Sequence, residues 1–94
     1  MQQQNEPNSL AAVLEELNER TLPRLTRIRE KLEHGETVGE TELNFFSTSL
    51  EHLQQCFKLY PDDEAQRIFA RLTGLFEDAI EQSLANEKRA RDDG

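Results

Sequence analysis

Residues 43–60 read LNFFSTSLEHLQQCFKLY. The large apolar side chains of this stretch recur at alternating steps of three and four residues, at Leu43, Phe46, Leu50, Leu53, Phe57 and Tyr60. An α-helix makes one turn in about 3.6 residues, so this spacing places all of them on one helix face. A second line of side chains lies about 100° further round the same helix and consists of Phe45, Ser49, His52, Cys56 and Leu59. A stripe this wide predicts a helix that contacts two neighbours.

The segment that precedes this stretch predicts a longer helix. Its core positions are Leu10, Leu14, Leu17, Thr21, Leu25, Ile28 and Leu32. Pro23 lies inside the pattern, where a proline removes one backbone hydrogen bond and displaces the preceding turn. Because the apolar stripe stays in phase on both sides, we expect one helix kinked near Pro23, with two shorter helices as the alternative. Asn8 or Ser9 can cap the N-terminus, and Gly35 suits the left-handed position after the C-terminus.

The chain after Pro61 predicts a third helix. Its apolar positions are Ala65, Ile68, Phe69, Leu72, Leu75, Phe76, Ala79, Ile80, Ser83 and Leu84. Asp62 or Asp63 can cap this helix, because a carboxylate oxygen accepts hydrogen bonds from the free N–H groups of a first turn. Thr37 and Glu40 fit a capping box at the start of the middle helix.

Three helices are therefore expected, at about residues 9–34, 38–60 and 62–90. Their connections are short, so consecutive helices should lie antiparallel. The predicted fold class is all-α, with three long antiparallel helices in an up-down-up bundle. A helical hairpin that completes its core by dimerising is the alternative. The most buried side chains should be Phe46, Leu50, Leu53, Phe57, Phe69, Leu72 and Phe76.

The length of the chain, 94 residues, allows one domain at most. We expect residues 1–8 to form a disordered N-terminal tail, because they are polar and carry no helical pattern. Residues 9–91 should form the single helical-bundle domain. Residues 92–94, where the apolar pattern has faded, should be frayed.

The formal net charge of −8 disfavours general binding to nucleic acid and to anionic membranes, since both carry negative phosphates. No apolar run approaches the roughly 20 residues of a membrane-spanning helix. Residues 1–7 do not resemble a signal peptide, since they lack both positive charge and an apolar stretch. The single cysteine, Cys56, excludes an internal disulfide. These features predict a cytoplasmic protein that does not bind membranes.

His52 and Cys56 are the pair of residues with the most chemistry to offer. They lie four residues apart and therefore share a helix face, as two zinc ligands or a Cys–His nucleophile pair would. A structural zinc site needs about four ligands, and a nucleophile needs an oxyanion hole. The sequence supplies neither around the pair. We expect both residues to flank the core, and we predict no catalytic residue, no metal and no cofactor.

The positive charges are concentrated in one stretch of the first helix. Residues 20–31 carry five basic side chains and one acidic one, a charge of +4, so the remainder carries −12. Four of the basic residues form a stripe at steps of four, three and four, namely Arg20, Arg24, Arg27 and Lys31. This basic stripe predicts a docking surface for an acidic partner, a phosphorylated segment or nucleic acid. The alternative is pairing with acidic residues of the same chain, such as Glu16 with Arg20 and Arg29 with Glu33.

The sequence does not name a function, and its helices favour a small protein–protein interaction module, a regulator or adaptor that is not an enzyme. A metal- or cofactor-binding bundle that uses His52 and Cys56 is one alternative. A nucleic-acid-associated protein that uses the basic stripe is another. Helices of unequal length should leave apolar positions uncovered, at Leu10, Leu84, Phe45 and Leu59. We therefore expect a homodimer, in which the basic stripe could meet an acidic face of the second subunit.

Overall fold

The computed structural model describes residues 9–93. Its helices are α1 (Leu10–Glu16), the π-helical turn η2 (Leu17–Thr21), α2 (Leu22–Glu33), α3 (Glu40–Leu59) and α4 (Asp63–Asp93). The first three follow one another without a break and form one rod, so the chain makes three rods in all. No strand occurs between residues 9 and 93. The predicted all-α class is confirmed, and the expected tail at residues 1–8 lies outside the described part.

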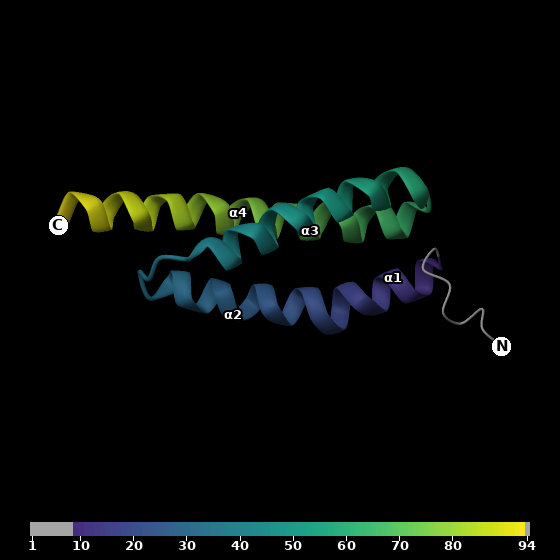
Figure 1. Ribbon diagram of the computed structural model, residues 1–94. Helices are drawn as coiled ribbons and strands as arrows, with labels where there is room; N and C mark the ends of the chain where they lie inside the picture. Colours follow the sequence, from purple (N-terminus) through teal and green to yellow (C-terminus); the bar gives the residue numbers. More distant parts are fainter. Residues whose placement is uncertain (1–8, 94) are drawn as a thin grey trace.

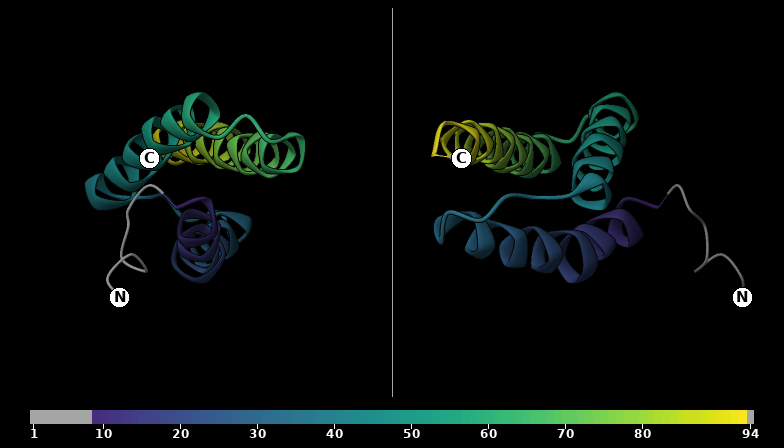
Figure 2. Two further views of the ribbon diagram at one scale, coloured as in Figure 1. Left: turned by 90° about the vertical axis from the view of Figure 1, so that its right-hand side faces the viewer. Right: turned by 60° about the vertical axis from the view of Figure 1, so that its left-hand side comes forward.

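The rods form the predicted up-down-up bundle (Figure 1). The first rod and α4 run in the same direction, and α3 runs back between them. Seen end-on, the three rods stand at the corners of a triangle (Figure 2, left). α4 packs against both α2 and α3, so it is the helix that joins the bundle. It also continues past the turn between α2 and α3, which makes the molecule long and narrow, at 56 × 25 × 17 Å.

The first rod passes Pro23 without ending, because the turn before the proline is wider than an α-helical one. The N–H of Leu22 bonds to the carbonyl of Leu17, five residues back. Pro23 itself takes a place in the first turn of α2, where a missing N–H costs little. The ribbon changes direction here (Figure 1). The predicted kink is confirmed, and the structure adds its form, a π-helical turn.

The core runs the length of the bundle and is centred on three phenylalanines. Its buried apolar members are Val13, Leu17, Leu25, Ile28, Leu32, Phe46, Leu53, Cys56, Ala65, Phe69, Leu72, Phe76 and Ala79. Five of the seven side chains predicted to be most buried are in this set. Leu50 and Phe57 are only half-buried. From the second apolar line of α3, Cys56 joins the core and is 1 % exposed.

The turn between α2 and α3 matches its sequence signals in one place and departs from them in another. Gly35 takes the left-handed conformation, with φ of 82°. Its N–H bonds to the carbonyl of Leu32 at 3.0 Å. The capping box predicted for Thr37 and Glu40 is wrong, since α3 begins two residues later than expected, at Glu40. Gly39 precedes the helix, and its N–H donates to Glu42 Oε1 at 2.6 Å, so the reciprocal carboxylate comes from Glu42.

Two amide side chains of α4 hold the ends of the other rods. Asn86 is 1 % exposed, and its Nδ2 donates to the carbonyl oxygens of Leu32 at 2.9 Å and Glu36 at 2.8 Å. At the opposite end, Gln66 Nε2 donates to the carbonyls of Phe57 at 3.0 Å and Tyr60 at 2.8 Å. Carbonyls of the last helical turn have no partner within their own helix, so these bonds fix where α2 and α3 end along α4.

The start of α1 follows its expected cap. Ser9 Oγ accepts a hydrogen bond from the N–H of Ala12 at 3.4 Å, so Ser9 caps α1 as predicted. α4 begins at Asp63, directly after Asp62, with acidic residues in its first turn. None of the helices within residues 9–93 has the length and apolar character that crossing a bilayer requires.

Candidate docking surfaces

His52 and Cys56 lie in different environments, one exposed and the other buried. Cys56 is buried in the core, and burial raises the pKa of its thiol, which keeps it protonated and unreactive at neutral pH. His52, one turn earlier on the same flank of α3, is exposed. Across residues 9–93, no group of three or more His, Cys, Asp or Glu side chains is placed to hold a metal ion. Burial of the thiol thus agrees with the expectation that Cys56 belongs to the core, whereas His52 lies at its exposed edge.

Part of the basic stripe is used inside the molecule. Lys31 Nζ lies 3.1 Å from Glu42 Oε2, a salt bridge between α2 and α3 in which both side chains are partly covered. The hydrogen bond from the backbone N–H of Gly39, followed by the one from Lys31, lowers the pKa of Glu42, and the charge of Arg24 adds to this. The guanidinium of Arg24 also lies over the ring of Phe45, 4.3 Å from its centre, which is a cation–π contact.

The other two residues of the stripe remain exposed. Arg20 and Arg27 form no salt bridge within the part of the chain that the structure describes. The expected pairs of Glu16 with Arg20 and Arg29 with Glu33 do not form there either. Arg24, Arg27 and Lys31 line a shallow hollow of about 320 Å³ together with Ile28, Thr41 and Glu42. The carboxylate of Glu42 lies inside this hollow and reduces its positive charge.

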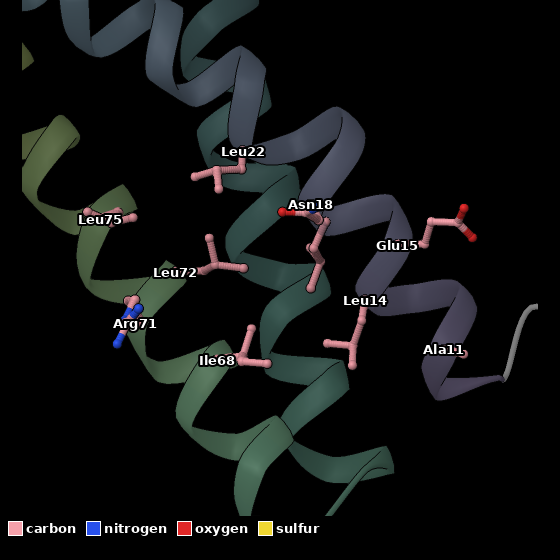
Figure 3. A pocket seen from close by; sticks show the side chains of 10 residues that line it. Ala11, Leu14, Glu15, Asn18, Leu22, Ile68, Arg71, Leu72 and Leu75 are labelled. Carbon is pink, nitrogen blue, oxygen red and sulfur yellow. The ribbon is translucent and has the colours of Figure 1, made fainter.

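A concave apolar groove lies between the first rod and α4 (Figure 3). It encloses about 690 Å³. One wall consists of Ala11, Leu14, Glu15, Leu17, Asn18 and Leu22, and the other of Ile68, Arg71, Leu72 and Leu75. In this view α3 passes behind the groove. Six of the ten side chains that line it are large and apolar, while Glu15 and Arg71 lie on opposite rims and point away from each other (Figure 3).

The groove exists because α4 is covered unevenly along its length. Its closest packing is with α2 and α3, and neither of these covers its first half on the side that faces α1. Ile68 is 40 % exposed as a result, although it continues the apolar stripe of α4. Leu14, Leu22 and Leu75 are half-buried around it. A contiguous set of uncovered apolar side chains is typical of an interaction surface.

The sequence assigned these residues to the core and could not show that they face an opening. The signal was present in the width of the α4 stripe, which has more apolar positions than two neighbouring rods can cover. The overhanging positions were partly identified: Leu59 and Leu84 are each 59 % exposed. The expectation is wrong for Leu10 and Phe45, which are half-buried against the core, Phe45 beneath the guanidinium of Arg24.

Comparison with known proteins gives no relative for this bundle: no family model matches the chain, and no curated protein or solved structure matches it either.

Proposed function

We propose that this protein is a small helical protein–protein interaction module, a regulator or adaptor, that binds a helix of its partner in the groove between α1–η2 and α4. The observation that carries the proposal is the groove itself, an open concave surface lined by six large apolar side chains. Amphipathic helices bind to other proteins by placing their apolar face in such a groove. The role we propose is binding in the cytoplasm, without catalysis.

The dimensions of the groove suit a short helical anchor. Leu14 and Leu22, the outermost leucines of the wall that starts at Ala11, are eight residues apart in sequence, which is about 12 Å along a helix. Three anchoring side chains at positions i, i+4 and i+7 of a partner helix span about 10 Å. Two turns of an amphipathic helix would therefore match the part of the groove between Leu14 and Leu22.

The basic stripe of Arg20, Arg24, Arg27 and Lys31 is a second proposed docking surface, for an acidic segment of a protein partner. The exposed guanidinium groups of Arg20 and Arg27 support it, and the internal contacts of Arg24 and Lys31 reduce what it can offer. The groove ranks first, because Ile68 is 40 % exposed along it and Leu14, Leu22 and Leu75 are only half-buried.

A pair of matched variants tests the groove. Ile68→Lys places a charge inside it at a position that is already 40 % exposed, so the fold should tolerate the change. Leu59→Lys makes the same kind of change at an exposed position outside the groove. In affinity capture from host-cell extract, a true partner should be retained by the wild type and by Leu59→Lys and lost with Ile68→Lys. Equal capture by all three would contradict the proposal.

A further inference from the structure

The groove needs an occupant with several apolar side chains on one face, and the chain's own N-terminal residues do not qualify. Residues 1–8 contain one large apolar side chain, Met1, and they include Pro7, which interrupts a helix. Residues 1–8 are therefore a poor occupant, and a second molecule is a better one. Since the walls of the groove are themselves two helices with apolar faces, a second copy of the chain offers surfaces of the required kind.

We infer that the groove is a homodimer interface, in which α1–η2 of each copy packs against α4 of the other. This inference rests on the groove being a docking surface, and it names the occupant. α1–η2 and α4 of one chain run in the same direction (Figure 1), so the groove has two parallel walls. Two such grooves placed face to face bring four helices together around one shared apolar core.

Two copies can be placed groove to groove in two ways, which differ in the direction of the two-fold axis, and the charges on the rims favour one of them. A two-fold axis that runs along the groove sets the α1 wall of each copy against the α4 wall of the other. An axis that runs across the groove sets each wall against its own counterpart. In the first arrangement Glu15 of one copy faces the wall that carries Arg71 of the other, and the pair occurs twice. In the second, each charge faces a wall of its own sign.

The two walls also differ in the sign of their charge beyond Glu15 and Arg71. Glu19 follows Glu15 by four residues on the first rod, and Arg67 precedes Arg71 by four on α4, and both side chains are exposed. The basic character of the α4 wall is local, because acidic residues lie seven positions away from Arg71 on either side. Charge complementarity thus favours the axis along the groove. It also offsets part of the repulsion between two chains that each carry −8.

Light scattering with the full chain tests the inference. The wild type should show twice the chain mass of 10.9 kDa at high micromolar concentration and approach the single mass on dilution. Ile68→Lys should weaken the dimer about 30-fold, because it places an unpaired charge in the centre of the interface. Leu59→Lys should leave the dissociation constant unchanged. Circular dichroism of each variant establishes that its helices are intact.

A charge exchange tests the arrangement of the copies. Arg71→Glu should weaken the dimer about tenfold, since the two-fold axis repeats the lost pair. Adding Glu15→Arg to the same chain should restore the wild-type constant to within about threefold, because the pair is re-formed with its signs exchanged. With an axis across the groove the double variant would gain nothing over the single one, and the proposed arrangement would be overturned.

The outcomes separate this inference from the proposed function. A wild-type mass of one chain at every concentration would overturn the second copy as occupant. Capture of a partner that is lost with Ile68→Lys would then still support the groove as a docking surface. If Ile68→Lys changed neither the mass nor the capture, the inference and the proposed function would both be wrong.

Discussion

Replacement of Asn86 by alanine should lower the free energy of unfolding by about 2.5 kcal/mol, which follows from the contacts of this side chain. Asn86 is buried in the second half of α4 and donates two hydrogen bonds to carbonyls at the end of α2. Each of these two bonds contributes roughly 1 kcal/mol net, because the unfolded chain replaces it with water. The third bond, from Gln82 Nε2 to Asn86 Oδ1, is left out of the sum because the exposed Gln82 can bond to water instead. The space left by the amide costs roughly 1 kcal/mol more. The higher helix propensity of alanine returns roughly 0.5 kcal/mol.

No penalty for a stranded carbonyl is included in this sum. The Leu32 carbonyl keeps its bond from the N–H of Gly35, and Glu36 is exposed, so water can reach its carbonyl. Asn86→Asp should be more damaging than Asn86→Ala, because it turns a carboxylate oxygen toward two carbonyl oxygens in a buried position. A domain of this size unfolds with about 5–15 kcal/mol, so either change should be plain in a urea titration.

The assay is urea unfolding followed by far-ultraviolet circular dichroism, at one protein concentration for all variants because association adds to apparent stability. Gln82→Ala is the matched control. Gln82 is exposed and donates to Asn86 Oδ1 at 2.8 Å, so its loss removes one bond and leaves both bonds to α2. It should cost no more than about 1 kcal/mol. If Asn86→Ala cost as little as Gln82→Ala, the reasoning that Asn86 fixes the end of α2 would be refuted.

Three further predictions concern single side chains. Glu42→Gln should cost about 1 kcal/mol at neutral pH. The lowered pKa of Glu42 means that its contribution is present above the ordinary glutamate value of about 4.3 and disappears as the pH falls through the lower folded value, so the difference from wild type should vanish in strong acid. Glu40→Gln, in the same turn, should show neither effect. Arg24→Ala should lower the free energy of unfolding through the lost ring contact, by roughly 0.5–1 kcal/mol, whereas Arg27→Ala should not. Cys56 should react with a thiol reagent far more slowly in the native protein than in urea, and equal rates would show that the thiol is accessible.

Most of the fold could be predicted because it depends on local periodicity. The three rods, their order and their approximate ends follow from apolar spacing and short connections. The form of the kink could also have been anticipated. Two turns of an α-helix take about 7.2 residues, whereas the buried Leu17 and Leu25 are eight residues apart, with two successive steps of four between them. A wider turn absorbs the excess and keeps both leucines on the core side.

The candidate site could be predicted only in part, since it depends on which faces remain uncovered. Spacing places Ile68 and Leu75 on the apolar side of α4, but it does not say that α1 lies too far away to cover them. Likewise, the basic stripe is evident from the sequence, while the use of Lys31 and Arg24 within the molecule depends on where Glu42 and Phe45 lie on α3. Such features depend on how the rods pack against one another. The apolar spacing of a single helix does not show this packing.

The two amides of α4 have a consequence for how the chain can change length. Gln66 and Asn86 are 20 residues apart on one uninterrupted helix, about 30 Å, and each satisfies the last carbonyls of a different rod. The spacing of Gln66 and Asn86 along α4 therefore sets the distance between the ends of α3 and α2 that they bind. A residue inserted between Gln66 and Asn86 would displace one amide by 1.5 Å and about 100° from its carbonyls, so one end of the bundle would open. Between Asn86 and residue 93, α4 makes no further hydrogen bond of this kind, so a change of its length there would leave both amides in place.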